Sequence, residues 1–170
     1  MLKLRPLSLS DEAEFRAAHA AMEEADEFPF GLAYEPGMDW ETYLKALEGY
    51  RTGISLPEPP VPSTFLVAEV DGQIVGRASI RHRLNELTRN YGGHIGYCVL
   101  PGHRRRGYAT EILRQALIVI RSIGVDRVLV VCEDDNAGSA AVIEACGGKL
   151  AQVLPPPVNA RVGIRHYWID

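Results

Sequence analysis

Three arginines and a glycine stand between an apolar segment and an amphipathic one, in a pattern that could bind phosphate. Residues 94–100 read as a strand that ends at Pro101-Gly102, and residues 111–120 read as a helix with a 3.6-residue apolar period. A helix N-terminus leaves amide N–H groups without partners, and the helix dipole adds positive charge there. Together with the arginines at 104–106, this end of the helix predicts an anion site suited to a phosphate ester.

The spacing of this turn distinguishes between known phosphate motifs. Neither a dinucleotide fingerprint nor a P-loop is present, but Arg104-x-x-Gly107-x-Ala109 follows Val99-x-Pro101. That pattern resembles the acetyl-CoA signature of the GNAT superfamily of N-acyltransferases. The resemblance implies that the turn holds the CoA pyrophosphate through Arg104, Arg105, Arg106, Gly107, Tyr108, Ala109 and Thr110. Glycine fits at 107 because the backbone must approach the phosphate closely and is free to adopt positive φ.

A second segment agrees with the first. A buried strand is expected at 128–132, followed by Asn136, Ser139 and a helix from 137 to about 146 that ends at Gly147-Gly148. This order resembles the family's second CoA segment, where an asparagine follows the fifth strand and the helix flanks the pantetheine arm. We therefore predict that Asn136 and Ser139 contact the cofactor. Asparagine is also a good helix N-cap, and the two roles are compatible.

The remaining elements fit the same family order. Strands are expected at 2–7, 64–70, 73–80, 149–154 and 162–169, and helices at 11–27 and 39–51, the first with an Asp11–Glu14 capping box. The proline-rich stretch 56–62 reads as a stiff connector and 84–93 as a polar loop. The order β-α-α-β-β-β-α-β-α-β-β matches the GNAT fold: an α/β (α+β) mixed, mostly antiparallel sheet with helices on both faces. We expect a single domain over residues 1–170.

Composition excludes several classes of protein. The net charge of −4 argues against a nucleic-acid partner, because such domains are usually basic. No apolar run approaches the ~20 residues of a membrane span, and the N-terminus lacks a signal-peptide core, so we expect a cytoplasmic protein with no membrane partner. Cys98, Cys132 and Cys146 lack metal-ligand spacing, and we interpret them as buried thiols and expect no metal.

The resemblance implies a reaction in which an amine attacks the thioester directly in a ternary complex. In the family a backbone amide of the fourth strand stabilises the oxyanion, and here that donor is expected near Val99. His94, at the start of that strand, is the first choice for the general base because imidazole titrates near neutrality. Glu133, after the fifth strand, is the second choice. Alternatively, His94 only begins an exposed strand end or packs in a polar pocket.

The chain departs from the family at the general acid. Many members carry a tyrosine in the helix after the asparagine, and that position here is near Ile143. Tyr97, Tyr108 or water then remain as proton donors, or the thiolate leaves unassisted. The departure keeps open an alternative function, an acyl-CoA-binding module with a sensory or assembly role and little catalysis.

The acceptor site is expected between the first two helices. An acidic cluster there, Glu23, Glu24, Asp26 and Glu27, lies close to aromatic residues in the sequence. If it lines the cleft, the acceptor carries a second positive charge; otherwise it is a solvated helix end. The function predicted is therefore acetyl transfer from acetyl-CoA to a primary amine of a small molecule or peptide. The sequence leaves the acceptor and the oligomeric state open, a homodimer included.

Overall fold

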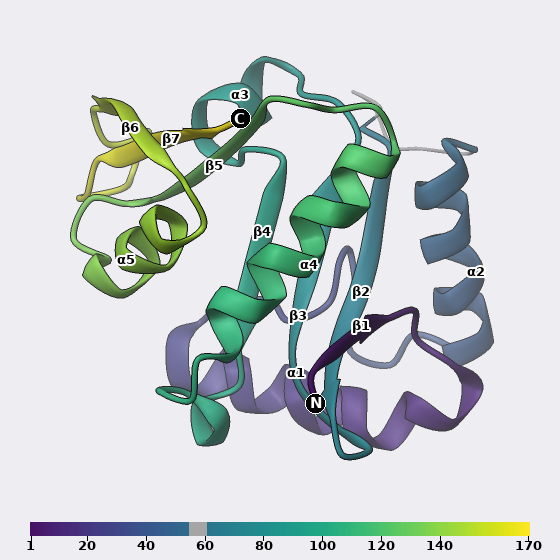
Figure 1. Ribbon diagram of the computed structural model, residues 1–170. Coiled ribbons are helices and arrows are strands. Elements are labelled where there is room, and N and C mark those ends of the chain that lie inside the picture. Colours follow the sequence, from purple (N-terminus) through teal and green to yellow (C-terminus); the bar gives the residue numbers. More distant parts are fainter. Residues whose placement is uncertain (55–60) are drawn as a thin grey trace.

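Two antiparallel sheets form the body of the protein in the computed structural model, which describes residues 1–54 and 61–170 (Figure 1). The first sheet has the strand order β1-β2-β3-β4, and the second has the order β5-β7-β6. The strands are β1 (Lys3–Arg5), β2 (Ser63–Val70), β3 (Gln73–Arg81), β4 (Ile95–Val99), β5 (Val128–Glu133), β6 (Lys149–Leu154) and β7 (Ile164–Ile169). Residues 55–60, which make up most of the predicted connector, lie outside the described residues.

Helices cover both faces of the first sheet. The helices are α1 (Glu12–Asp26), α2 (Trp40–Thr52), α3 (Glu86–Tyr91), α4 (Tyr108–Ser122) and α5 (Ala137–Ala145). In Figure 1, α4 crosses one face of the sheet, while α1 and α2 lie behind the other. The predicted element order is confirmed except for α3, which it lacked, and the match to known acetyltransferase structures given below confirms the fold class.

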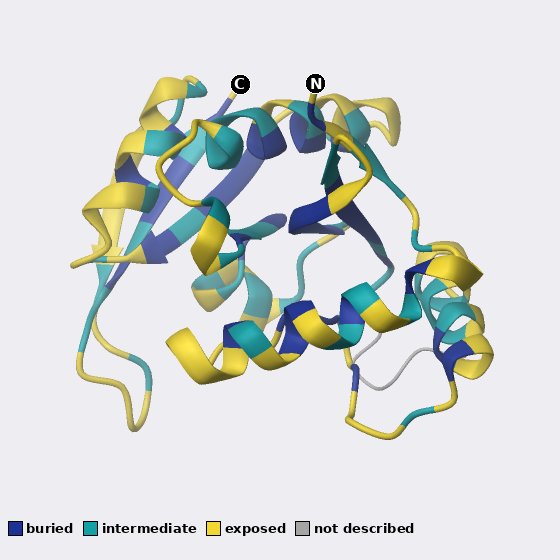
Figure 2. Cartoon of the chain, turned by 90° about the horizontal axis from the view of Figure 1, so that it is seen from below, coloured by how far each residue is buried: buried dark blue, intermediate teal, exposed yellow. Residues whose placement is uncertain are grey.

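A buried apolar layer lies on each face of the first sheet. On one face, Ile112, Leu113 and Ile120 of α4 pack against Ala78 and Ile80 of β3. On the other face, an aromatic layer joins α1 and α2 to β2 through Phe15, Tyr43 and Phe65. Figure 2 shows the resulting pattern, with buried residues on the inner sides of the helices and exposed residues outside. Each fully buried large side chain contributes about 1.5–3 kcal/mol to stability.

The two sheets meet where β4 and β5 begin, and the strands then diverge (Figure 1). At the meeting point the backbone amide of His94 donates to the carbonyl of Leu129 (2.7 Å). The amide of Leu129 donates in turn to Nδ1 of the His94 ring (2.9 Å). The His94 ring thus takes the place of a main-chain acceptor, and the hydrogen-bond ladder between β4 and β5 does not continue. The divergence of β4 and β5 follows from that interruption.

Two local expectations were wrong. Asp11 does not form a capping box with Glu14; it accepts two hydrogen bonds from the Arg5 guanidinium (2.7 and 2.8 Å), and the capping box of this segment joins it to Ser8. Glu14 instead accepts from the amide of Ile74 (2.6 Å). The second error is the loop at 84–93, which contains α3. That helix has a capping box of its own, and its six residues are too few to show apolar periodicity.

Candidate active site

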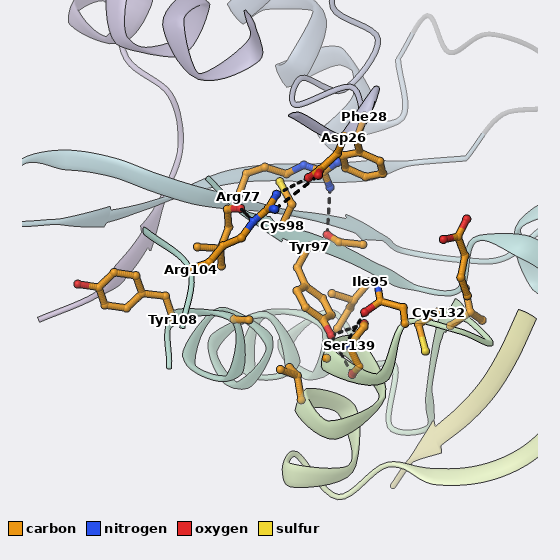
Figure 3. A pocket seen from close by; sticks show the side chains of 18 of the residues that line it. Asp26, Phe28, Arg77, Ile95, Tyr97, Cys98, Arg104, Tyr108, Cys132 and Ser139 are labelled. Atoms are coloured by element: carbon orange, nitrogen blue, oxygen red, sulfur yellow. Dashed lines mark hydrogen bonds and ion pairs between the residues drawn. The ribbon is translucent and has the colours of Figure 1, made fainter. Parts of the chain in front are cut away.

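A cavity of about 980 Å³ occupies the space between the diverging strands (Figure 3). Its walls come from β3, β4 and β5, from the turn before α4, from α5, and from the end of α1. Most of the predicted site residues line it: Val99, Arg104, Arg105, Gly107, Tyr108, Ala109, Thr110, Glu133, Asn136 and Ser139. His94 and Arg106 are not among the lining residues. The fold therefore gathers two distant sequence segments into one cleft.

The turn before α4 has the backbone geometry of an anion site. Gly107 occupies the N-cap position with φ of 78°, and no side chain caps the first turn of the helix. The amides of that turn are therefore left for a ligand or for water. A Cβ at Gly107 would meet no atom within 4 Å, so the residue is glycine because of its left-handed φ and not because of crowding.

The three arginines of this turn differ in what they do. Arg105 lines the cavity, whereas Arg106 donates to the carbonyl of Gly102 (3.2 Å). Arg104 turns back toward α1, where it forms an ion pair with Asp26 and donates to the carbonyl of Val99 (3.2 Å). Figure 3 shows Arg104 reaching Asp26. In this arrangement Arg104 joins the turn to α1, and of these three arginines Arg105 is the one that lines the cavity without a carboxylate partner among the described residues.

Tyr97 and Ser139 bridge the cleft from opposite walls (Figure 3). The hydroxyl of Tyr97, on β4, forms a hydrogen bond with that of Ser139, on α5 (2.8 Å). Burial raises the pKa of Tyr97 to about 12, so the phenol is protonated at neutral pH. Asn136 caps α5 by accepting from the amide of Ser139 (2.9 Å). Ile143 is fully buried in the core, and Tyr97 therefore brings a hydroxyl to a helix that has no tyrosine at position 143.

Strand β4 presents free amides to the cleft. Leu100 donates to the carbonyl of Val75 (2.9 Å), and the amide of Arg81 donates to the carbonyl of His94 (2.7 Å), both along the edge shared with β3. Alternate residues of an antiparallel strand bond to the same neighbour. Because β4 is the edge strand, the amides of Ile95, Tyr97 and Val99 point away from β3. The donor expected near Val99 is thus oriented toward the cavity.

The two residues considered for the general base lie in different environments. His94 is buried, and Nδ1 of its ring accepts the hydrogen bond from Leu129. Burial, aided by the charge of Arg89, lowers its pKa to about 4. The ring therefore fixes the junction between the sheets, and this geometry does not support a role as base. Glu133 is exposed at the end of β5 and lines the cavity.

The acceptor end of the cavity differs from the acidic cleft anticipated above. Of the cluster Glu23, Glu24, Asp26 and Glu27, only Asp26 lines the cavity, and Arg104 already pairs with it. Two residues that the sequence analysis missed, Arg77 and Arg81, line this end instead. The available signal was a pair of arginines four residues apart in a largely apolar strand. The prediction of a cationic acceptor therefore has no support in the geometry.

Of the three cysteines expected to be buried, Cys132 is buried, whereas Cys98 and Cys146 are partly buried. Burial raises the pKa of Cys98, Cys132 and Cys146, which keeps each thiol protonated at neutral pH. In the described ranges, no group of three or more His, Cys, Asp or Glu side chains could hold a metal ion. Among the helices that the structure describes, none is both long and apolar enough to cross a membrane.

An uncapped helix N-terminus thus lies beside a cleft that the outward amides of β4 face, an arrangement able to hold a phosphate ester. A family model described as an acetyltransferase (GNAT) domain matches residues 1–149. The chain therefore belongs to the GNAT acetyltransferase family and is an acetyltransferase. This result confirms the resemblance noted in the sequence.

Solved structures of N-acetyltransferases share the fold. RimJ from Mycobacterium smegmatis, in complex with CoA-disulfide, has a TM-score of 0.71 at 21% identity, over 99% of this chain and 81% of that one. The protein yncA from Salmonella typhimurium, solved with its cofactor acetyl-CoA, has a TM-score of 0.68 at 18% identity, covering 99% and 93%. A ribosomal-protein-alanine N-acetyltransferase from Brucella melitensis has a TM-score of 0.66 at 23% identity, covering 98% of each chain. No curated protein is similar enough to match the chain.

Proposed function

We propose that this protein transfers the acetyl group of acetyl-CoA to a primary amine of a small molecule or peptide, by direct attack in a ternary complex. The observation that carries the proposal is the position of the uncapped N-terminus of α4 at the mouth of the cleft between β4 and β5. If the pyrophosphate of acetyl-CoA binds at this helix end, the rest of the cofactor extends into the cleft. The acetyl-CoA found in yncA is consistent with this use of the fold.

The cofactor side of the proposed site combines backbone and side-chain donors. The amides of Tyr108, Ala109 and Thr110, in the first turn of α4, bind the pyrophosphate together with the charge of Arg105. Gly107 keeps this turn open through its left-handed φ. Asn136 shapes the opposite wall by capping α5, and Ser139 lies beside the pantetheine path.

The acyl centre is held against β4. The amide of Val99 points into the cleft and donates to the carbonyl oxygen of the thioester as negative charge develops on it. A preorganised donor of this kind contributes roughly 3–4 kcal/mol to the stability of the transition state. The neutral amine attacks the carbonyl carbon and forms the C–N bond; the tetrahedral intermediate then collapses, the C–S bond breaks, and CoA leaves as its thiolate.

The acceptor nitrogen loses two protons in passing from ammonium to amide, and the leaving thiolate needs a hydrogen-bond donor. Glu133 accepts the first proton from the ammonium group of the acceptor, directly or through water, since it is the acidic residue of the predicted pair that lines the cavity, and the neutral amine is then able to attack. The second proton leaves the nitrogen for solvent after the C–N bond has formed. The Tyr97 hydroxyl donates a hydrogen bond to the leaving sulfur. Because its pKa of about 12 lies above that of a thiol, Tyr97 stabilises the thiolate by hydrogen bonding more than by full proton transfer.

The test is release of free CoA with a panel of primary amines, with the N-acetyl product identified by mass spectrometry. We expect saturable turnover with at least one amine, and a fall of about 10²- to 10⁴-fold for Glu133→Gln. Asp135→Asn, an exposed neighbour outside the cavity lining, is the control. Tight binding of acetyl-CoA without turnover on any amine would favour the binding module over the enzyme.

A further inference from the structure

We propose that the acceptor carries an anionic group, a carboxylate or a phosphorus oxyanion, which binds to Arg81 beside Arg77 at the far end of the cavity. This inference rests on the proposed function, because it names the class of amine that the same site takes. It predicts a zwitterionic small molecule, such as an amino acid, as the preferred acceptor. Two arginines of β3 that line the cavity, Arg77 buried and Arg81 partly buried, supply the charge for such a group.

Arg77 is a buried guanidinium held by main-chain carbonyls. Its side chain belongs to a residue that is only 7% exposed, and it donates to the carbonyls of Pro29 (3.1 Å), Phe30 (3.0 Å) and Gly96 (3.3 Å). The ring of Phe28 stacks on it, 5.0 Å from the guanidinium carbon (Figure 3). These contacts orient the group against β4 but supply no negative charge.

Arg81 lies on the same face of β3, four residues further along. It is partly buried, and its Nη1 donates to the carbonyls of Gly92 (3.2 Å) and Gly93 (3.1 Å). Burial and the nearby charge of Arg77 lower its pKa. Among the described residues, neither arginine has a carboxylate oxygen within 4.0 Å of its nitrogens. Both line the cavity, whose acceptor end therefore holds uncompensated positive charge.

Ser79 stands between the two arginines on this face of the strand. It is only 6% exposed, and its Oγ is a buried polar atom without a hydrogen-bond partner among the residues that the structure describes. A buried hydroxyl without a partner is costly, at roughly 1–3 kcal/mol. Ser79 does not line the cavity, so the two arginines that do, one buried and one partly buried, are the groups that complement an anion with several acceptor oxygens.

The opposite wall supplies the other half of the match. Glu133 lines the cavity from β5, on the far side of the cleft from β3. A molecule with an anionic group toward Arg81 and an amine toward Glu133 places both charges against their opposites. An acceptor with two positive charges would instead meet the arginines. Coulomb attraction in this partly desolvated space is stronger than in bulk water, so the difference decides selectivity.

The experiment compares matched amines in the CoA-release assay. Each common amino acid is paired with the amine that lacks its carboxylate, and 2-aminoethylphosphonate and putrescine extend the panel. We expect the best carboxylate- or phosphonate-bearing acceptor to exceed its uncharged partner, and putrescine, by at least about 10-fold in kcat/KM. If carboxylates win and the phosphonate does not, the anion is a carboxylate; the reverse result assigns a phosphorus oxyanion.

Variants then locate the anion site. Arg81→Gln should lower kcat/KM for the anionic acceptor by about 10- to 100-fold, mainly through KM, and should leave the affinity for acetyl-CoA unchanged. Arg81→Lys should recover part of the loss because it keeps the charge. Arg121→Gln removes an exposed charge from the last turn of α4 and serves as the control. A neutral amine or putrescine as the preferred acceptor, or an unchanged KM in Arg81→Gln, overturns the inference while leaving acetyl transfer intact.

Binding provides a readout that does not depend on turnover. Calorimetry on the CoA complex compares N-acetyl amino acids with the N-acetyl amines that lack the carboxylate. Acetyl-CoA binding with no turnover on any amine contradicts the proposed function, and calorimetry then decides the anion site alone. Preferential binding of the carboxylates that is lost in Arg81→Gln supports the inference, and no such preference overturns it.

Discussion

At the scale of single residues, the hydroxyl of Tyr97 is the group best placed to assist the leaving thiolate. It reaches Ser139 across the cleft at 2.8 Å, so its position is fixed by a partner on the opposite wall. A hydrogen bond to a charged group contributes about 1.5–3 kcal/mol. Tyr97→Phe should therefore lower kcat by about 10- to 100-fold at unchanged acetyl-CoA affinity.

The control for Tyr97 is its partner. Ser139→Ala keeps the phenol but frees it to rotate, and we expect a smaller loss in kcat than for Tyr97→Phe. Steady-state kinetics with saturating acetyl-CoA measure both variants. Equal kcat in wild type and Tyr97→Phe would leave water as the proton donor.

His94 makes a prediction about stability rather than catalysis. Its pKa is about 4 in the folded protein and near 6.5 when unfolded, so the unfolded state binds the proton more tightly. The contribution of His94 is full above pH 6.5 and is lost as the pH falls toward 4. The free energy of unfolding should therefore drop by about 3 kcal/mol between pH 7 and pH 4 through this residue.

The matched variant is His94→Asn, whose Oδ1 replaces Nδ1 as acceptor for the Leu129 amide but does not titrate. Urea titrations of both proteins across this pH range isolate the histidine, because all other titrating groups are shared. We expect a flatter profile for the variant. If the free energy of unfolding of both proteins fell equally with pH, protonation of His94 would not destabilise the fold, contrary to what its burial predicts.

At the scale of elements, the ion pair between Arg104 and Asp26 joins the turn before α4 to the end of α1. Both side chains are about two-fifths exposed, so the pair contributes at most about 1 kcal/mol to stability. We expect the ion pair to matter mainly by positioning the turn. Arg104→Gln and Asp26→Asn should therefore change the affinity for acetyl-CoA by the same factor, which should be less than about 5-fold. A double-mutant cycle should give non-additive effects.

Arg105→Gln is the comparison for this pair. Because Arg105 faces the cavity without an ion-pair partner among the described residues, its loss should weaken acetyl-CoA binding more than the loss of Arg104. Calorimetric titration of the four proteins measures this order. A large loss of affinity in Arg104→Gln, with none in Asp26→Asn, would return Arg104 to the phosphate site.

At the scale of the whole molecule, cofactor binding should stabilise the fold because the cleft joins both sheets. At a concentration of acetyl-CoA 100 times its Kd, linkage adds about 2.7 kcal/mol, which for a chain of this size raises Tm by roughly 5–10 °C. Gly107→Glu should abolish this rise by placing a negative charge at the anion site. Differential scanning calorimetry with and without acetyl-CoA measures it.

The chain offers a matched control for that substitution. Gly124 also has a left-handed φ, of 93°, with open space around it, but it follows the opposite end of α4. Gly124→Glu thus introduces the same strain and charge away from the cavity, and it should keep the full rise in Tm. A full rise in Gly107→Glu would refute the phosphate turn.

The sequence by itself determined the order of the elements other than α3 and the glycine turn before α4, because both depend on neighbours along the chain. The apolar period of α4, the Asp71-Gly72 hairpin and the left-handed Gly107 are local features, and the structure retains each of them. The sequence did not predict α3, because a helix of six residues is too short to show apolar periodicity.

Only the tertiary structure decided which partner each polar side chain takes. Arg104 meets Asp26, 78 residues earlier, and His94 meets Leu129, 35 residues later. Arg77 and Arg81 look like solvated strand residues until the 28–30 segment and the end of α3 close over them. A charged side chain takes the partner that folding brings near, and that choice depends on contacts between segments far apart in the chain.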